Sequence, residues 1–161
     1  MNTAAVLARI ENAQNSNYLD LRASNIYVLP KEIGSLKNLT HLYIEDNNLS
    51  ELPISFGGLK SLRVLGLENN KLSELPREIG CLDNLETLYL GDNRLTELPR
   101  EIEGLKDLET LDLENNKLIE LPREIEGLGS LKALYLENNN FPKGAYDSLL
   151  KTVKARRNTT A

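Results

Sequence analysis

Few side chains in this sequence have the types and spacing that enzyme chemistry requires. The chain contains one histidine, His41, and one cysteine, Cys81, forty residues further on. A nucleophilic cysteine needs its thiol within hydrogen-bond reach of a base, and this spacing gives no indication of such a dyad. The sequence has no C-x-x-C, H-x-x-x-H, Gly-rich phosphate loop or G-x-S-x-G motif. We therefore expect no enzyme and no cofactor.

Carboxylates are the one reactive group present in quantity. Glu45 and Asp46 are neighbours, and similar acidic residues recur at a constant interval along the chain. The calcium-loop pattern D-x-[DN]-x-[DN]-G is missing. Since the acids follow a period, we favour a solvated surface over a dedicated acid–base pair or a metal site. A carboxylate-based ligand- or metal-binding protein stays open as an alternative.

The interval is a 23-residue repeat. Each turn follows the pattern L-x-x-L-x-L-x-x-N-x-L-x-x-L-P-x-x-[IF]-x-x-L-x-x, without insertion or deletion, and a degraded copy from Ser16 precedes the regular ones. The last copy breaks at Phe141-Pro142. Cys81 fills a position that holds glycine or serine in other copies, so we interpret it as structural. The regular copies begin at Leu39, Leu62, Leu85, Leu108 and Leu131.

Each part of the repeat has a physical role. The alternation Leu65-x-Leu67 has period two and predicts a short strand with one buried face. Such strands, stacked in parallel about 4.8 Å apart, build a continuous sheet. The Leu-Pro pair and the following glycines favour extended or 3-10 structure over α-helix on the opposite side. The side-chain amide of the repeated asparagine can form hydrogen bonds with buried backbone groups where the chain turns. This asparagine recurs as Asn47, Asn70, Asn93, Asn116 and Asn139.

These in-phase copies resemble the leucine-rich-repeat superfamily, in the 23-residue class with L-P-x-x-I-x-x-L in the second half of the repeat. The resemblance covers residues 16–142. It implies an α/β solenoid, a curved right-handed superhelix with a parallel β-sheet on its concave face and an extended or 3-10 convex side. Such repeats occur in many bacterial proteins and in the intracellular Ras-group proteins of animals and plants. This sequence carries no ligase, kinase or GTPase domain, so those family activities are not expected here.

The segments that flank the repeats predict helices that cover the ends of the array. Val6, Leu7 and Ile10 share one face of a helix over residues 3–13, with Thr3 as its N-cap. A second amphipathic pattern includes Ala145, Tyr146, Leu149, Leu150 and Val153. The expected organisation is a capping helix over 1–15, turns over 16–38, 39–61, 62–84, 85–107, 108–130 and 131–142, the last one partial, a capping helix over 143–157 and a tail over 158–161.

The outward positions of the strands are free for recognition, since they do not pack in the core. Three columns, which begin at Asp20, Arg22 and Ala23, hold eight acids and one base. Tyrosines in alternate turns add contact area and hydrogen bonds suited to interfaces, although tyrosine also suits a strand surface. The candidate partner-binding residues are Tyr43, Tyr89, Tyr135, Glu45, Glu68, Asp112, Glu114 and Glu137, with His41 and Arg63 as weaker candidates.

The leading functional hypothesis is a non-enzymatic module that binds a protein or peptide with a basic or mixed surface. A self-associating structural module is the alternative, because the fourth and fifth turns share Leu-Pro-Arg-Glu-Ile-Glu-Gly-Leu and their regularity can reflect duplication alone. A net charge of −5 argues against nucleic acid and anionic membranes as partners. Without a Sec-type signal peptide or an apolar span, we expect a cytoplasmic monomer. Signal-independent export stays open.

Overall fold

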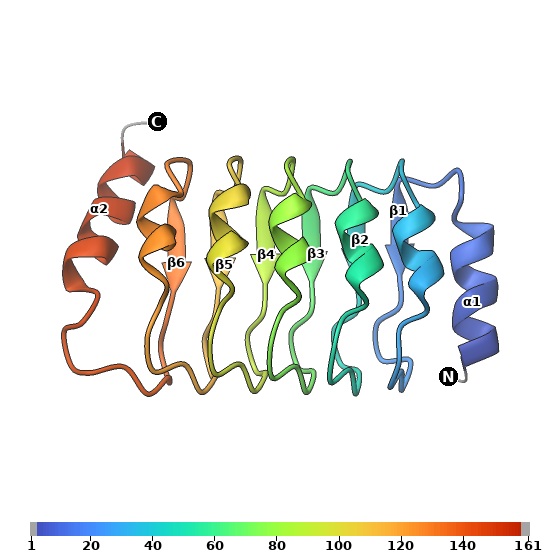
Figure 1. Cartoon of the computed structure of the whole chain (residues 1–161), viewed down its shortest axis with the longest axis horizontal. Coiled ribbons are helices and arrows are strands. Elements are labelled where there is room, and N and C mark those ends of the chain that lie inside the picture. The colour runs from blue at the N-terminus through green and yellow to red at the C-terminus, as the bar shows by residue number, and fades with distance from the viewer. Residues whose placement is uncertain (1–2, 159–161) are drawn as a thin grey trace.

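Figure 1 shows a computed structural model, which describes residues 3–158 as a row of stacked turns with a helix at either end. Six strands form one parallel sheet in chain order, and a 3-10 helix follows each of the first five strands on the opposite side. The strands are β1 Tyr18–Asp20, β2 His41–Tyr43, β3 Val64–Gly66, β4 Thr87–Tyr89, β5 Thr110–Asp112 and β6 Ala133–Tyr135. The 3-10 helices are η1 Lys31–Ser35, η2 Ile54–Gly58, η3 Arg77–Cys81, η4 Arg100–Gly104 and η5 Arg123–Gly127.

The register of the sheet is one repeat. Leu42 pairs with Leu65 and Leu65 with Leu88, so equivalent residues of successive turns stack in straight columns. Hydrogen bonds between turns continue beyond the strands, as where the Leu67 N–H donates to the Tyr89 carbonyl at 2.9 Å. The predicted solenoid, with strands on one side and 3-10 turns on the other, is confirmed.

The core is aliphatic and runs the whole length of the array. The inward leucines of the strands, such as Leu65 and Leu67, and the isoleucine of each 3-10 turn, such as Ile79, have no exposed surface. Burial of one such side chain contributes about 1.5–3 kcal/mol. Phe56 replaces the isoleucine in η2 and is fully buried. Because every turn contributes the same set of residues, the core repeats with the sequence.

The asparagine column supplies the hydrogen bonds at the turn that follows each strand. Asn70 donates from Nδ2 to the carbonyls of Ile44 (3.0 Å) and Leu67 (3.1 Å) and accepts from the Leu49 N–H (3.0 Å). Asn47, Asn70, Asn93 and Asn116 are buried, whereas Asn139 in the last turn is only half-buried. Each amide therefore connects its own turn to the one before it.

The 3-10 side depends on proline and on close packing between turns. Pro76 lies immediately before η3 with an extended backbone (φ −66°, ψ 147°), which fits the fixed φ of proline. Gly80 in η3 lies so close to the Glu101 carbonyl of η4 that a Cβ at position 80 would collide with it. This glycine is needed because two backbones approach closely.

The first helix, α1 (Thr3–Asn12), packs against η1 at the N-terminal end. Val6 and Ile10 are buried, and Leu7 only partly. Thr3, expected as the N-cap, lies within the helix. Arg9 donates to the Asp20 carbonyl (3.3 Å). In the next turn, the equivalent carbonyl of Tyr43 accepts a hydrogen bond from the Leu21 N–H of the turn before it. Arg9 therefore supplies the donor that a preceding turn would otherwise give to Asp20.

The second helix, α2 (Asp147–Asn158), packs against β6 and buries Val153. It begins later than the sequence pattern indicates, because Ala145 and Tyr146 lie in the preceding turn. Asn158, expected in the tail, is its last residue, while residues 1–2 and 159–161 lie outside the described range. Neither of the two helices between residues 3 and 158 is long and apolar enough to span a bilayer.

The free edge of β6 is protected by a side chain. The Leu136 N–H, which has no further turn to pair with, donates to Glu137 Oε2 at 3.0 Å. In the preceding turn, the equivalent Leu113 N–H donates to the Tyr135 carbonyl. Together with Arg9 at the other end, Glu137 leaves the sheet with fewer unpaired groups that another strand could use.

Candidate functional site

The solvent side of the sheet, termed here the concave face, consists of three columns of outward side chains. The first column contains the first residue of each strand and the second contains the third residue. The third column lies two residues further on. In chain order, the first column is Tyr18, His41, Val64, Thr87, Thr110 and Ala133, the second is Asp20, Tyr43, Gly66, Tyr89, Asp112 and Tyr135, and the third is Arg22, Glu45, Glu68, Gly91, Glu114 and Glu137.

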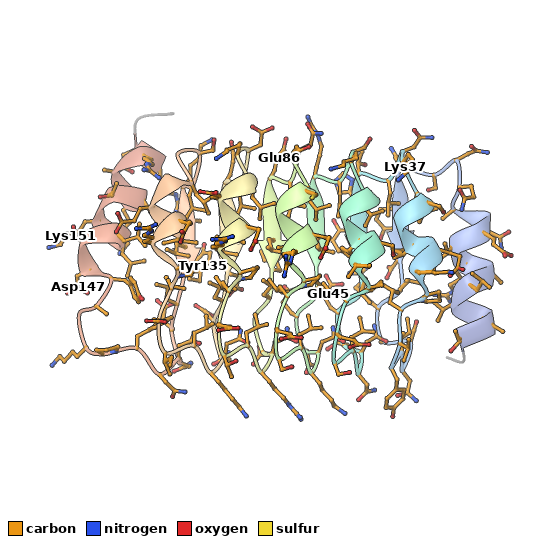
Figure 2. The ribbon with its side chains drawn as sticks, in the orientation of Figure 1. Lys37, Glu45, Glu86, Tyr135, Asp147 and Lys151 are labelled. Carbon is orange, nitrogen blue, oxygen red and sulfur yellow. The ribbon has the colours of Figure 1, made fainter. Side chains whose placement is uncertain are left out.

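The charge of the concave face changes across its width. The first column holds no acidic side chain, whereas four of the six residues in the third column are glutamates. In Figure 2, Glu86, which precedes β4, lies near one edge of the solenoid, and Glu45, which follows β2, lies nearer the middle. A partner laid along the solenoid would therefore meet a neutral strip beside an acidic one.

The column that begins at Ala23, expected on this face, belongs to the turn instead. Asp46 and Asp92 have positive φ (58° and 55°), a left-handed conformation that Asp and Asn tolerate better than most residues. Asn69, the equivalent residue of the next turn, donates to Asp46 Oδ1 at 2.6 Å. These side chains are explained by turn geometry, so the acidic strip is one column wide rather than two.

An aromatic cluster occupies the N-terminal part of the concave face. The Tyr43 ring lies 5.5 Å from that of Tyr18 and 6.4 Å from that of His41. The Arg22 guanidinium lies 5.2 Å from the Tyr43 ring centroid. Burial raises the pKa of Tyr43. Tyr18 was missed in the sequence, although counting back two residues from Asp20 would have placed it on this face.

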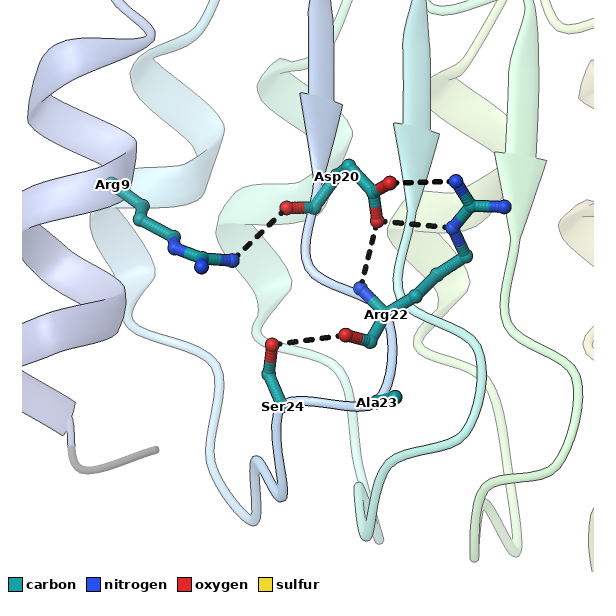
Figure 3. Close-up of a pocket in the computed structure, with 5 residues that line it drawn as sticks. All are labelled: Arg9, Asp20, Arg22, Ala23 and Ser24. Atoms are coloured by element: carbon teal, nitrogen blue, oxygen red, sulfur yellow. Dashed lines mark hydrogen bonds and ion pairs between the residues drawn. The ribbon is translucent and has the colours of Figure 1, made fainter.

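Arg22, the one base of the three columns, is held by an acid of its own turn. Its Nη2 lies 2.6 Å from Asp20 Oδ2 and its Nε donates to Asp20 Oδ1 at 3.0 Å, as Figure 3 shows. These bonds lower the pKa of Asp20 to about 2, although burial opposes the shift. The two residues, with Arg9, Ala23 and Ser24, line an open depression of about 780 Å³. The pair carries no net charge, although the Arg22 guanidinium also lowers the pKa of Glu45 in the next turn.

Two glycines interrupt the columns of outward side chains at the middle of the concave face. Gly66 lies between Tyr43 and Tyr89 in the register of the sheet, and Gly91 is the equivalent gap in the third column. The Glu45 carboxylate lies directly over Gly66, where a Cβ would collide with it. The Glu45 carboxylate therefore covers Gly66, which is buried, between the two tyrosine positions.

Two carboxylates of this region are only partly satisfied. Glu45 Oε2 and Glu68 Oε2 are secluded from solvent and have no hydrogen-bond partner. Burial raises the pKa of both groups, and a hydrogen bond from each residue's own N–H partly opposes the shift. The charges of Glu45 and Asp112 raise the pKa of Glu68 further. The positive charge of Arg22, in contrast, lowers the pKa of Glu45 and partly opposes the effect of burial there.

At the C-terminal end, Tyr135 is 41% exposed, and Glu114 and Glu137 are paired. The pKa of Glu114 is raised because its protonated form can donate to the Glu137 carboxylate. The pKa of Glu137 is lowered, because its carboxylate accepts its own N–H and that of Leu136. Arg63 stands apart from these groups, at the rim, where its Nη1 lies 3.3 Å from Glu86 Oε1.

The predicted candidates therefore form three groups along the face rather than one continuous site. Tyr43 and His41 lie together in the N-terminal cluster. At the centre, the charges of Glu45 and Asp112 act on Glu68, and at the C-terminal end Glu137 acts on the pKa of Glu114. Within residues 3–158, no group of three or more His, Cys, Asp or Glu side chains is arranged to hold a metal ion.

A sequence profile described as leucine rich repeat matches residues 15–72 and 82–141. The chain belongs to the leucine-rich-repeat family. The resemblance that the repeat pattern indicated is thus confirmed over most of the chain. None of the curated protein sequences compared with this leucine-rich-repeat chain matches it.

Solved structures of leucine-rich-repeat proteins share the fold. A leucine-rich-repeat protein of Leptospira interrogans is 38% identical over 89% of this chain and 43% of its own, with a TM-score of 0.69. The ectodomain of the receptor kinase GASSHO1/SCHENGEN3 of Arabidopsis thaliana, solved in complex with CASPARIAN STRIP INTEGRITY FACTOR 2, is 36% identical over 70% of this chain and 14% of its own, with a TM-score of 0.64. An internalin of Listeria monocytogenes, 24% identical over 78% of this chain and 36% of its own (TM-score 0.68), shares the fold alone. The chain spans less than half the length of each of these proteins.

Proposed function

We propose that this leucine-rich-repeat chain is a non-enzymatic module that binds a protein or peptide partner on its concave face. The observation that carries the proposal is the column of glutamates that runs beside Tyr43, Tyr89 and Tyr135 on the solvent side of the sheet. These side chains do not pack in the core, and a partner that brings cations and hydrogen-bonding groups would complement them. The complex of the related plant ectodomain supports binding of a protein ligand by this fold.

The partner's surface is basic or mixed. Glu45, Glu68, Glu114 and Glu137 line one side of the face, and Asp20 neutralises the nearby Arg22. Complementary charge accelerates association and selects the partner's orientation. The neutral first column and the tyrosines accommodate apolar and hydrogen-bonding groups of the same partner. Nucleic acid and anionic membranes do not complement this face, and we propose a cytoplasmic monomer.

Self-association is the second candidate for the chain, and the strand edges argue against its usual route. The outermost groups, the Asp20 carbonyl and the Leu136 N–H, are already bonded to Arg9 and Glu137. Edge-to-edge pairing of sheets would have to break these bonds. Sedimentation at increasing protein concentration distinguishes the two candidates, since a mass that rises with concentration supports self-association.

The proposal is tested by charge reversal on matched surfaces. Peptides that bind the wild-type protein are first selected from a random library. Their affinities are then measured for the double variant Glu68→Lys/Glu114→Lys and for the control Glu97→Lys/Glu120→Lys. Both variants change the net charge equally, but the control glutamates are exposed and lie outside the three columns. The concave variant should weaken binding at least ten-fold and flatten its salt dependence, with the control within about two-fold. Equal effects of the two variants, or none, would refute the concave face as the site.

A further inference from the structure

A cavity separates the last strand, β6, from part of the helix α2 that covers it. Its volume is about 70 Å³, and its apolar walls are formed by Ala133, Leu134, Leu150 and Val153. Val153 is buried, so α2 is held against the strand beside the cavity. Tyr135 also lines the space, and with Ala133 it belongs to the columns of the concave face. We term this space, at the C-terminal end of that face, the β6–α2 pocket.

The pocket coincides with the smallest side chain of the first column. In the preceding turns this column holds Tyr18, His41, Val64 and two threonines, whereas β6 carries Ala133. Because Ala133 is part of the wall, a larger side chain at this position would fill some of the space. The covering helix α2 leaves the space open.

Cations line the pocket together with the aliphatic side chains. Lys132, Lys154 and Arg157 are part of its lining, and α2 as a whole carries two lysines and two arginines against one aspartate. Lys132 is held by Glu109, whose Oε1 lies 2.6 Å from its Nζ. Among residues 3–158 no salt bridge includes Lys154, although its charge lowers the pKa of Glu137. The pocket is therefore basic, whereas the third column beside it is acidic.

The edge of the sheet adds a backbone donor. β6 is the last strand and pairs only with β5. The Leu136 N–H points to the free edge, where Glu137 accepts it. Alternate residues of a strand direct their N–H groups to the same edge, so the Leu134 N–H lies there too and has no strand to pair with. Since Leu134 is part of the wall, we expect an oxygen atom of a ligand to accept from this N–H as well as from the Lys154 ammonium.

We propose that the β6–α2 pocket receives the carboxylate of an aspartate or glutamate side chain of the protein partner. The inference rests on the proposed function and adds the chemistry of one residue that the partner presents. The pocket has the volume of about two water molecules in the liquid, which suits the two oxygens of a carboxylate and is too small for a phosphate or an aromatic ring. The aliphatic walls accommodate the methylene groups, and the ammonium of Lys154 donates a charge-assisted hydrogen bond.

This carboxylate would fix the direction of the partner along the solenoid. The partner's basic groups would lie over Glu68 and Glu114 in the third column, and its acidic residue would lie at the C-terminal end, beside Tyr135. In the reverse direction, the acidic residue would meet the acidic column and the basic groups would meet α2. Opposite charges at fixed places select one orientation in this way.

Two substitutions test the pocket. Lys154→Gln removes the charge and keeps most of the aliphatic stem. Lys151→Gln is the matched control, because it makes the same change in the same helix, but Lys151 is exposed on the side of α2 that faces away from the array (Figure 2). Ala133→Val fills part of the pocket without a change in charge, and the strand accepts valine, since Val64 occupies the same column. Circular dichroism and thermal unfolding verify that each variant folds.

The probes are the peptides selected on the wild-type protein and copies in which each aspartate or glutamate is replaced by its amide. We expect one acidic position whose replacement weakens binding to the wild type by about ten-fold or more, as for a hydrogen bond to a charged group. Lys154→Gln should bind the acidic and the amide peptide equally weakly. Ala133→Val should also weaken binding of the acidic peptide, and Lys151→Gln should behave as wild type. Isothermal titration calorimetry measures each affinity.

Four outcomes would overturn the inference. Peptides that lose affinity with Glu68→Lys/Glu114→Lys, but respond equally to Lys154→Gln and Lys151→Gln, would leave the proposed function intact and remove the pocket from it. Peptides indifferent to the charge reversal would remove the proposed function itself. Affinity that falls when the peptide's C-terminus is amidated, and with no side-chain replacement, would make the chain end the occupant. Self-association of the wild type that Lys154→Gln abolishes in sedimentation would make a second copy the occupant.

Discussion

The asparagine column offers the sharpest test of how the turns are held together. Asn93 accepts the Leu72 N–H (3.0 Å) and donates to the carbonyls of Leu67 (2.9 Å) and Leu90 (3.1 Å). In Asn93→Ala the buried Leu72 N–H loses its acceptor, which costs about 1–3 kcal/mol. The two carbonyls keep other donors, so each lost bond adds about 0.5–1.5 kcal/mol. The free energy of unfolding should fall by about 2–6 kcal/mol.

Neighbouring asparagines share acceptors, so their substitutions should not be additive. The Leu67 carbonyl accepts from both Asn70 (3.1 Å) and Asn93 (2.9 Å). Either single variant leaves it one donor, whereas Asn70→Ala/Asn93→Ala leaves it none. The double variant should therefore lose about 1–3 kcal/mol more than the sum of the single ones.

Asn139 supplies the control for this cycle. It bonds to Leu113, Leu118 and Leu136 and shares no partner with Asn93. The losses of unfolding free energy in Asn93→Ala and Asn139→Ala should therefore add up in the double variant. Asn139→Ala alone should lose less free energy than Asn93→Ala, because the Asn139 amide is half-buried and water can replace it. Urea unfolding followed by circular dichroism gives each free energy. Equal coupling in both pairs, or a loss below about 1 kcal/mol for Asn93→Ala, would refute the shared-acceptor reasoning.

Three further predictions follow from single contacts. Burial raises the folded-state pKa of Glu68 above its ordinary 4.5, so the ionisation of Glu68 destabilises the fold as pH rises past that value. In urea titrations, Glu68→Gln should increase the free energy of unfolding at pH 7 and lose this advantage below pH 4.5. An equal gain at both pH values would contradict the shift. Glu137→Ala exposes the Leu136 N–H at the sheet edge, and sedimentation should detect association that Glu137→Gln, which keeps an acceptor, does not show. Gly80→Ala should lower the free energy of unfolding by about 1–3 kcal/mol, because the new methyl group overpacks against η4. Gly127→Ala should leave it unchanged in the same urea titration. Equal losses would show that the close approach of the two backbones is not the cause.

The fold could be predicted from the sequence because each column carries its own chemical signature. Leucines two residues apart specify an inward strand face, and asparagine followed by Leu-Pro specifies the turn and the extended return. The helix ends were less predictable. Tyr146 fits an amphipathic helix by spacing, yet its hydroxyl accepts the Leu121 N–H at 2.6 Å, a contact with another turn that only the folded chain shows.

The candidate site was predicted as a set of positions but not as groups. Repeat arithmetic places Tyr43, Tyr89 and Tyr135 on one column, but their rings interact with whichever neighbours have side chains of suitable length. Gly66 interrupts the tyrosine column, and only the folded chain shows that the Glu45 carboxylate covers it. Rotamers and the seclusion of single oxygens are determined by packing, which a one-dimensional pattern does not contain.

The one-repeat register also has a kinetic consequence. Side-chain and backbone bonds between turns join residues only 21–26 positions apart, as in the Leu49–Asn70 and Ile44–Asn70 bonds. Every turn closes a loop of the same modest length, so the entropy of ordering the chain does not grow with distance along the array. Opening can then proceed one turn at a time from either end. Amide exchange should be slowest at the middle turns, so the middle of the concave face lies in the part of the molecule that opens least.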